Sequence, residues 1–299
     1  MLNVALLGYG RIGQMHAENL FNHSKFNLLY VYDKNYKLAL KSKNKFKNKV
    51  ITNYKIALND KKVDIIFIAS PTPTHIKFIE ESVFFNKIVF CEKPLDLNIS
   101  KVKACIKKLS KKNPKIQLGF NRRYDPGHFQ LKKDLKKKKI GILQKIIITS
   151  RDPAPPPINY LKESGGLFKD MMIHDFDLCR FYLENDEIIE LSATASSFTN
   201  FYKKIKDHEL ASVTMKSRKG VICVITNSRQ SSYGYDQRVE LFGSKGMLIS
   251  GNQNSNQTEI YNSSSTSSKK PYLNFFIERY KDAYKNQLND LAKFAKKNI

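Results

Sequence analysis

Apolar residues within the first 120 positions form short runs that alternate with segments of helical periodicity. The run VDIIFIA at 63–69 is apolar at nearly every position, as is typical of a parallel strand covered on both faces. The pattern predicts strands at 3–7, 27–32, 63–69, 88–90 and 116–120, and helices at 14–22, 36–45, 74–85 and 100–110. This alternation implies an α/β fold with a doubly wound parallel sheet and right-handed crossovers. Ser100 is expected to cap the last of these helices.

The pattern changes after Gly119. Here it predicts helices at 124–138, about 167–183 and 275–296, and strands at 143–150, 190–198, 209–215, 221–228 and 237–242. We expect an α+β domain with a largely antiparallel sheet and helices on one face. Residues 151–157, RDPAPPP, predict a rigid extended loop, and the Asn/Ser/Thr-rich stretch 252–270 predicts a mobile loop. The expected domains are therefore 1–120 and 121–299.

Composition narrows the class of protein. The 299 residues suffice for two domains with separate cores, and a hydrophobic content of 41% is ordinary for a globular chain. The apolar N-terminus runs straight into a glycine loop, so we interpret it as a first strand and not as a signal peptide. No apolar run of about 18 residues predicts a membrane span. The cysteines at 91, 105, 179 and 223 are scattered, which argues against a metal site or a disulfide framework and favours a cytoplasmic location.

The net charge of +25 raises the possibility of a nucleic-acid partner. Only nine of the 52 basic residues are arginine, and the lysine runs fall on amphipathic or loop-like segments. We interpret them as a solvated basic surface and expect neither a nucleic-acid nor a membrane partner.

Residues 8–13, GYGRIG, follow an apolar strand and precede a helix, which is the context of a dinucleotide-binding loop. Gly8 permits the tight turn, Gly10 lets the backbone approach a pyrophosphate, and Gly13 allows close packing of helix on strand. Asp33 ends the next strand and is expected to bind the ribose hydroxyls. Its charge favours NAD over NADP, although Lys34 could tolerate a 2′-phosphate.

The loop SPTPTH follows the strand at 63–69, and open α/β sheets bind ligands at the carboxyl ends of their strands. We expect this loop to line the cofactor, with a solvent-facing His75 as the alternative. Beyond the three glycines and Asp33, the predicted cofactor contacts are Arg11, Ile12, Ser70, Pro71, Thr72, His75, Glu92 and Lys93.

Two further segments carry residues suited to proton transfer. Lys93 follows the strand at 88–90 and precedes a proline, and its ammonium could hydrogen-bond a reacting hydroxyl, although an ordinary surface lysine is the alternative. Asp170 and His174, within GGLFKDMMIHDFD at 165–177, are four positions apart and are expected to share a helix face. Asp170 can then hold one imidazole nitrogen while the other accepts a proton, unless the pair is structural. Asp177 is expected to support this pair, and Asp175 to face solvent or a neighbouring segment.

These segments, with GFNRRYDP, NSRQSSYGYDQRVELFGSKGML and FFIERYKDAY, resemble the Gfo/Idh/MocA oxidoreductases over nearly the full length, and within that family the members that oxidise inositol. The resemblance implies a Rossmann domain for NAD, and an α+β domain that binds a small-molecule polyol and pairs subunits into homo-oligomers, dimers or tetramers, through its sheet. It implies oxidation of the C2 hydroxyl of myo-inositol to 2-keto-myo-inositol, a step of inositol catabolism, with Lys93, Asp170 and His174 as catalytic residues. The implied substrate contacts are Lys93, Asn121, Arg123, Asp152, Asp170, His174, Tyr233 and Tyr235.

Family members usually continue beyond the last predicted helix, so the chain is expected to be shortened at its C-terminus. Two alternatives stay open. One is a related enzyme acting on another polyol or sugar, such as scyllo-inositol, or on an inosose in the reductive direction. The other is a catalytically silent NAD-binding regulator.

Overall fold

The computed structural model describes residues 1–296, which cluster into two compact units. Unit 1 comprises Met1–Phe120 and the chain from Tyr284 onward, and unit 2 comprises Asn121–Ala283. The expected domains placed the C-terminal helix with the second half, whereas its apolar residues Leu288 and Leu291 are buried in the core of unit 1. Helical periodicity shows that a helix has an apolar face, but not which core that face joins.

Unit 1 is built on a six-stranded parallel sheet in the order β3-β2-β1-β4-β5-β6. Its strands are β1 (Leu2–Leu7), β2 (Phe26–Tyr32), β3 (Lys49–Ile51), β4 (Ile65–Ile68), β5 (Ile88–Cys91) and β6 (Ile116–Leu118). Its helices are α1 (Arg11–Phe21), α2 (Tyr36–Phe46), α3 (Lys55–Asn59), α4 (His75–Phe84), α5 (Ile99–Leu109) and most of α11 (Lys281–Lys296), with short 3₁₀ turns at Thr72–Thr74 and Ser110–Lys112.

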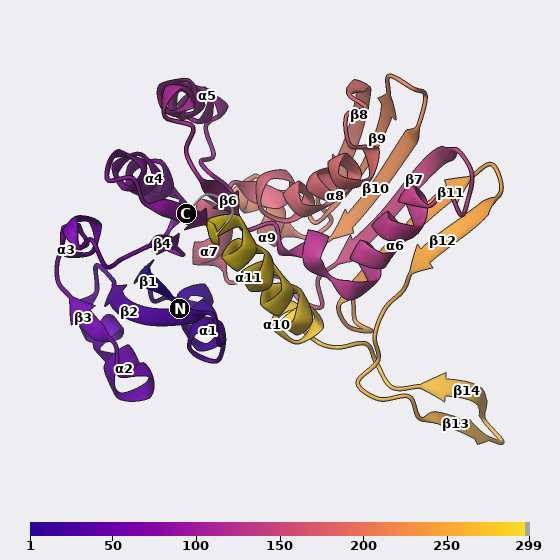
Figure 1. Cartoon of the computed structure of the whole chain (residues 1–299). Coiled ribbons are helices and arrows are strands. Elements are labelled where there is room, and N and C mark those ends of the chain that lie inside the picture. Colours follow the sequence, from indigo (N-terminus) through magenta and orange to yellow (C-terminus); the bar gives the residue numbers. More distant parts are fainter. Residues whose placement is uncertain (297–299) are drawn as a thin grey trace. The chain divides into compact units, whose positions relative to one another are not determined.

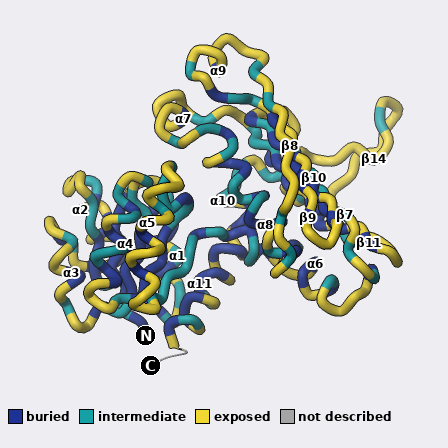
Figure 2. Tube along the Cα trace, turned by 90° about the horizontal axis from the view of Figure 1, so that it is seen from above, coloured by how far each residue is buried: buried dark blue, intermediate teal, exposed yellow. Residues whose placement is uncertain are grey.

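Helices cover both faces of this sheet, as Figure 1 shows and as the continuous apolar runs predict. Alternate residues of each central strand enter two separate cores, one shared with α1, α2 and α11 and the other with α3, α4 and α5. Figure 2 shows these dark, buried strands enclosed by helices with exposed outer surfaces. The predicted doubly wound parallel sheet is therefore confirmed. The strand order reverses between β1 and β4, and such a switch point is where open α/β sheets bind ligands.

The cap of α5 differs from the prediction. Asn98, and not Ser100, precedes the helix, and its side-chain oxygen accepts hydrogen bonds from the main-chain nitrogens of Ser100 and Lys101 at 2.9 and 3.4 Å. Asn98 has the extended backbone of an N-cap residue, with φ −104° and ψ 112°. Ser100 is already inside the first helical turn.

Unit 2 contains a second six-stranded sheet in the order β12-β11-β7-β10-β9-β8. Its strands are β7 (Leu143–Arg151), β8 (Ile188–Ser196), β9 (Leu210–Ser217), β10 (Ile222–Ser228), β11 (Asp236–Gly243) and β12 (Gly246–Ser250). All neighbours are antiparallel except β7 and β10, which confirms the predicted largely antiparallel sheet. Its helices are α6 (Pro126–Lys136), α7 (Ile158–Ser164), α8 (Ile173–Leu183), α9 (Asn200–Ile205) and α10 (Phe276–Arg279), with a 3₁₀ turn at Asn121–Tyr124.

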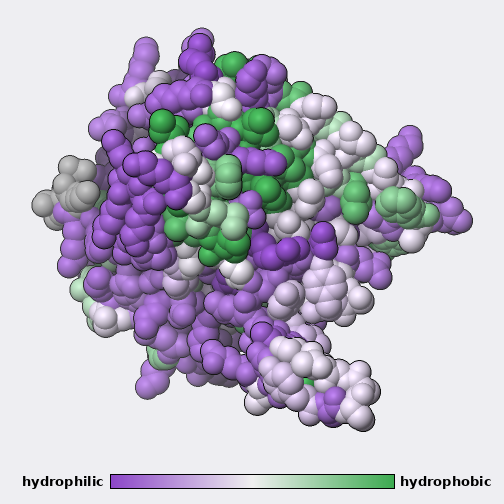
Figure 3. All heavy atoms as spheres, turned by 90° about the vertical axis from the view of Figure 1, so that its right-hand side faces the viewer, coloured by the Kyte–Doolittle hydropathy of each residue, from purple (hydrophilic) through white to green (hydrophobic). Residues whose placement is uncertain are grey.

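Among the described residues, the helices of unit 2 pack on one face of this sheet. Along β9 every second residue is buried, and the buried set packs in one core with residues of α6 and α8. The opposite side, called here the open face, is drawn in Figure 3, where apolar side chains gather among polar ones. Its exposed apolar residues include Ile222, Phe242, Met247 and Ile249.

Two segments of unit 2 differ from the pattern-based expectations. Residues 252–270, predicted to be a mobile loop, contain a hairpin of β13 (Glu259–Asn262) and β14 (Ser265–Lys269). The predicted helix at 167–183 is interrupted, because Phe168–Met172 form a π-helical turn before α8 begins. Such turns often occur at functional sites, and this one contains Asp170.

Within the described residues 1–296, no helix combines the length and apolarity that crossing a bilayer would require.

Candidate active site

The glycine loop after β1 is shaped by close contacts that exclude side chains. Gly8 has φ +100°, and a Cβ added there would lie 2.5 Å from the main-chain nitrogen of Ser70. A Cβ on Gly13 would lie 2.1 Å from the carbonyl oxygen of Gly8. Both distances are well below van der Waals contact. Glycine at position 8 therefore lets the loops after β1 and β4 meet, and glycine at position 13 lets α1 pack closely on the loop after β1.

Gly10 plays a different part in the same loop. It precedes α1 as its N-cap residue without any side-chain cap, and a Cβ added there would have nothing within 4 Å. The start of α1 therefore faces open space, where the helix dipole and uncapped N–H groups suit a phosphate. This cradle fits the pyrophosphate of a dinucleotide.

Asp33 directly follows β2 and binds the glycine loop. One carboxylate oxygen accepts a hydrogen bond from the main-chain nitrogen of Tyr9 at 2.7 Å, and the other accepts one from Asn35 at 2.8 Å. A carboxylate oxygen has two acceptor positions, so each can still accept a ribose hydroxyl. The arrangement fits the predicted role of Asp33 toward the adenosine ribose.

His75 does not face solvent, which was the alternative for it. Its ring is buried, Nδ1 lies 2.8 Å from the carbonyl oxygen of Pro94, and Nε2 lies 2.8 Å from that of Ser70. The ring therefore bridges the loops after β4 and β5 and does not face solvent. Both nitrogens already contact the main chain, so a role toward the cofactor would be indirect. Ser70 itself contacts Thr74, with 2.6 Å between their hydroxyl oxygens.

The segment that leads to Lys93 is also held by its neighbours. Oε1 of Glu92 lies 2.7 Å from Nε2 of the buried His16, and Oε2 accepts from the main-chain nitrogen of Lys93 at 3.3 Å. A Cβ on Gly119 would lie 2.7 Å from that same Oε2. Glu92 thus supports the backbone of Lys93. His16 was not predicted, because it is 76 positions away from Glu92.

Unit 2 brings together two predicted site residues, Asp152 and Asp170, around one arginine that the sequence analysis missed. Arg229, just after β10, donates from Nη1 to Oδ2 of Asp170 at 3.0 Å and lies 3.9 Å from Oδ2 of Asp152. The hydroxyl of Tyr160 donates to Oδ1 of Asp170 at 2.7 Å. His174 follows in the first turn of α8 and is half-buried. The cluster provides a fixed carboxylate close in sequence to a half-buried imidazole.

Burial raises the pKa of Asp152 to about 6, although Arg229 and Arg122 oppose the shift. Its side chain remains 23% exposed. Asp152 is therefore mostly ionised at neutral pH and can accept hydrogen bonds from a polyol there, but takes up a proton in mildly acidic solution.

Arg122 and Asp175 form a buried ion pair at 2.6 Å, so Asp175 faces a neighbouring segment, the second of its two expected surroundings, and not solvent. Ser150 and Asn227 donate to the same carboxylate at 2.7 and 2.8 Å. Tyr235, a predicted substrate contact, is buried beside this pair, with its hydroxyl 3.5 Å from Nη2 of Arg122. This network lies inside unit 2.

The remaining predicted substrate contacts occupy separate places. Arg123 donates twice to Asp177, at 2.7 and 2.6 Å, so Asp177 holds Arg123. Asn121 is buried in a 3₁₀ turn. Tyr233 is exposed and donates to Asp236 at 2.8 Å, beside a hollow of 370 Å³ on the open face.

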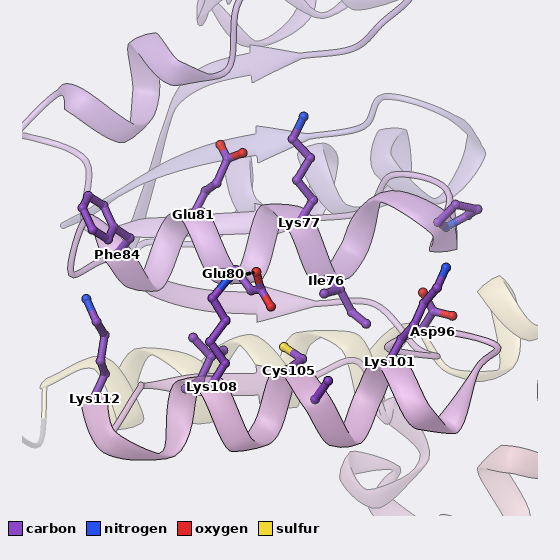
Figure 4. Close-up of a pocket in the computed structure, with 13 residues that line it drawn as sticks. Ile76, Lys77, Glu80, Glu81, Phe84, Asp96, Lys101, Cys105, Lys108 and Lys112 are labelled. Carbon is purple, nitrogen blue, oxygen red and sulfur yellow. Dashed lines mark hydrogen bonds and ion pairs between the residues drawn. The ribbon is translucent and has the colours of Figure 1, made fainter.

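A larger hollow of 690 Å³ lies between α4 and α5 in unit 1 (Figure 4). Lysines and glutamates line its rim, and Lys108 pairs with Glu80 across it at 2.5 Å. It contains none of the predicted site residues. In the described part of the chain, no group of three or more His, Cys, Asp or Glu side chains is placed to hold a metal ion.

Comparison with known proteins agrees with this geometry. Residues 2–120 match the family described as "Oxidoreductase family, NAD-binding Rossmann fold", and residues 128–249 match the GFO/IDH/MocA C-terminal domain. Inositol 2-dehydrogenase of Rhizobium meliloti is 39% identical over 287 residues, covering 95% of this chain and 85% of the relative.

Two solved structures are also similar. A myo-inositol dehydrogenase from Corynebacterium glutamicum has a TM-score of 0.95 and 38% identity, over 99% of this chain and 89% of that one. A scyllo-inositol dehydrogenase from Lactobacillus casei, solved with NAD(H) and scyllo-inositol, has a TM-score of 0.89 and 26% identity, over 98% and 88%. The predicted resemblance and the predicted NAD cofactor are thereby confirmed, and the chain belongs to the Gfo/Idh/MocA family of NAD-binding oxidoreductases.

Proposed function

We propose that this protein oxidises myo-inositol at its C2 hydroxyl to 2-keto-myo-inositol and passes the hydride to NAD. The observation that carries the proposal is the 39% identity, over 95% of the chain, to a relative named inositol 2-dehydrogenase. The glycine cradle of unit 1 and the Asp170 cluster of unit 2 supply the two kinds of chemistry that the reaction needs.

Lys93, Asp170 and His174 are proposed to handle the proton. The ammonium of Lys93 hydrogen-bonds the reacting oxygen and stabilises the negative charge that grows there. His174 accepts the hydroxyl proton on a ring nitrogen, and Asp170 stabilises the imidazolium that forms. Bound NAD supplies the hydride acceptor. The hydroxyl oxygen thus loses its proton to the protein, and the carbon that bears it loses its hydrogen as a hydride to the cofactor, which leaves a carbonyl.

The other proposed substrate contacts are suited to a neutral polyol, which offers only hydroxyl groups. Asp152 is the strongest of them, because it is partly exposed beside the Asp170 cluster. Asn121, Arg123, Tyr233 and Tyr235 remain proposals. Arg123 and Tyr235 are already engaged by Asp177 and Arg122, so they would act by shaping the site.

Replacing His174 with alanine tests the role of the base. Turnover should fall by roughly 10²–10⁴-fold while the Kd of NAD stays unchanged. His23→Ala, in unit 1, is the matched control and should retain turnover. Turnover at the normal level in His174→Ala would exclude His174 as the base.

We propose that the protein is a homo-oligomer, a dimer or tetramer, paired through the open face. The support is the set of exposed apolar side chains on β10, β11 and β12 (Figure 3), which a second copy would cover. Phe242→Lys with Ile249→Lys should lower the mass measured by light scattering, whereas Ile99→Lys on α5 should not. An unchanged mass in the double variant would argue against this interface.

A cytoplasmic location is also proposed, supported by the use of NAD and by four free cysteines, all buried within the described residues.

A second substrate has specific support. The similarity to a scyllo-inositol dehydrogenase solved with its substrate makes scyllo-inositol the main alternative. Comparing kcat/KM for myo- and scyllo-inositol separates the two, and a higher value for scyllo-inositol would replace the first proposal.

A further inference from the structure

Arg229 is a buried cation at the end of β10. Its side chain is only 1% exposed, and its main-chain nitrogen donates to the carbonyl oxygen of Glu209 at 2.8 Å. A guanidinium taken out of water is tolerated only where carboxylates compensate for its lost hydration. The groups around Arg229 therefore indicate what it does.

Three carboxylates surround this guanidinium, but only one is hydrogen-bonded to it. Nη1 donates to Asp170 at 3.0 Å and lies 3.9 Å from Asp152, while Nη2 lies 3.9 Å from Asp207. Burial alone lowers the pKa of Arg229, but Asp170 and Asp152 more than offset it, so the net shift is upward and the side chain stays charged. Asp170 is therefore the carboxylate with which the guanidinium of Arg229 interacts most directly.

The carboxylate of Asp170 is held at both oxygens by groups from two other elements. Arg229 donates to Oδ2, and the hydroxyl of Tyr160, on α7, donates to Oδ1 at 2.7 Å. Rotation of the carboxylate about its last torsion would break both bonds. Its plane is consequently fixed.

Asp207 holds the start of the helical segment that contains Asp170. Its Oδ1 accepts from the main-chain nitrogen of Leu167 at 2.9 Å, and a Cβ added to Gly166 would lie 2.8 Å from that oxygen. Its Oδ2 is the atom 3.9 Å from Arg229. Arg229 thus lies between Asp207, which anchors the helical segment, and Asp170, which the proposed reaction uses.

We propose that Arg229 is the positioning residue for Asp170, keeping this carboxylate ionised and oriented for its work on His174. This inference rests on the proposed function of Asp170 and His174, and it extends the site to a residue outside the predicted set. Tyr160 holds the other carboxylate oxygen of Asp170 and is expected to contribute less to its orientation than Arg229 does.

Two substitutions of Arg229 separate charge from geometry. Arg229→Met removes a buried positive charge that faces Asp152, Asp170, Asp207 and Tyr202. Loss of this neighbouring cation makes ionisation of the Asp152 and Asp170 carboxyls less favourable. The acid limb of the kcat/KM profile should therefore move to higher pH. Arg229→Lys keeps the charge but not the planar fork, so its acid limb should stay near that of the unaltered protein while kcat still falls.

The expected decreases in kcat follow from the loss of a fixed orientation of the Asp170 carboxylate. Arg229→Met should lower kcat by about 10²-fold, as expected for a misplaced catalytic group. Tyr160→Phe should lower it by about 10-fold, the effect of one hydrogen bond to a charged group. The Kd of NAD should not change in any of these variants. Arg218→Met, at an exposed position in the turn between β9 and β10, is the matched control and should behave like the unaltered protein.

Carbon-13 NMR titration of the Asp170 carboxyl gives the same test without turnover. A raised Asp170 pKa in Arg229→Met, with the wild-type value kept in Arg229→Lys, is the expected result. If that shift occurs and no polyol is oxidised by the unaltered protein, the proposed function fails while the placement of Arg229 stands. An Asp170 pKa that does not change in Arg229→Met would overturn the inference. Unchanged kcat in both Tyr160→Phe and Arg229→Lys would also overturn it. If Arg229→Met does not fold, these two milder variants provide the test.

Discussion

Replacing Arg122 with methionine is expected to destabilise unit 2 far more than the same change at the adjacent Arg123. Both arginines pair with a carboxylate of α8 at 2.6 Å. The Arg122 and Asp175 side chains are 5% and 0% exposed, whereas that of Arg123 is 38% exposed. Methionine keeps an apolar stem of similar length, so the comparison isolates the charge and its burial.

The magnitude can be worked out in two ways. Without Arg122, the carboxylate of Asp175 keeps hydrogen bonds from only Ser150 and Asn227, and breaking a buried pair costs about 3–5 kcal/mol. If Asp175 instead takes up a proton at pH 7, the cost relative to its ordinary pKa of 3.8 is at most about 4 kcal/mol, because burial already raises the pKa of Asp175 in the unaltered protein. Arg123→Met removes a partly exposed pair, for which about 1 kcal/mol is expected.

The two variants should also differ in their dependence on pH. In Arg122→Met the folded-state pKa of Asp175 rises further above its unfolded value, so the folded state gains stability as pH falls toward that value. The free-energy difference from the unaltered protein should shrink by up to about 1.4 kcal/mol per pH unit below pH 7. Arg123→Met should show a smaller dependence.

Urea unfolding followed by far-ultraviolet circular dichroism measures these differences, because the chain contains no Trp for fluorescence. Equal losses of stability in both variants would refute the reasoning. A loss in Arg122→Met that does not vary with pH would show that Asp175 is not the group left uncompensated.

Three further outcomes are expected. Asp33→Ser should narrow the preference for NAD over NADP, measured as the ratio of their kcat/KM values, and an unchanged ratio would mean that Asp33 does not face the ribose. Gly10→Ala should weaken NAD binding in a titration without lowering the melting temperature of the free protein, whereas Gly13→Ala should lower that temperature, since its Cβ would lie 2.1 Å from the oxygen of Gly8. Asp152→Asn should remove a titration near pH 6, so the unaltered protein should lose up to about 3 kcal/mol of stability relative to this variant as the pH rises from 4 to 6; parallel stability curves would contradict the raised pKa.

The architecture of unit 1 was predictable because its strands are buried on both faces, so apolar runs such as 63–69 record their environment directly. The glycine loop and Asp33 were predictable for a related reason: each acts through local backbone geometry near its own position. The short β3 and α3 lack such a pattern and were missed.

Contacts between distant positions were not predictable in the same way. Arg122 and Arg123 are identical neighbours, and only the packing of α8 against the 3₁₀ turn decides which one is buried with Asp175. Arg229 lies 59 positions from Asp170. Its burial in a strand-end loop has no periodic signal, although its place within the segment NSRQSS, next to polar residues after an apolar strand, was a usable hint.

The proposed catalytic residues could be recognised from their motifs, but their supports could not. Glu92 and Lys93 stand out by position after β5, whereas the contacts that His16 and His75 make with that segment are known only from the structure. Likewise, the spacing of Asp170 and His174 predicted a simple helical pair, whereas a π-helical turn contains Asp170.

The most direct test of the central claim is the formation of NADH, followed by its near-ultraviolet absorbance, when the purified protein is mixed with NAD and myo-inositol. The unaltered protein should produce NADH, and Lys93→Ala should bind NAD but produce little or none. No NADH from the unaltered protein, or equal rates from both, would contradict the proposed reaction or the role of Lys93 in it.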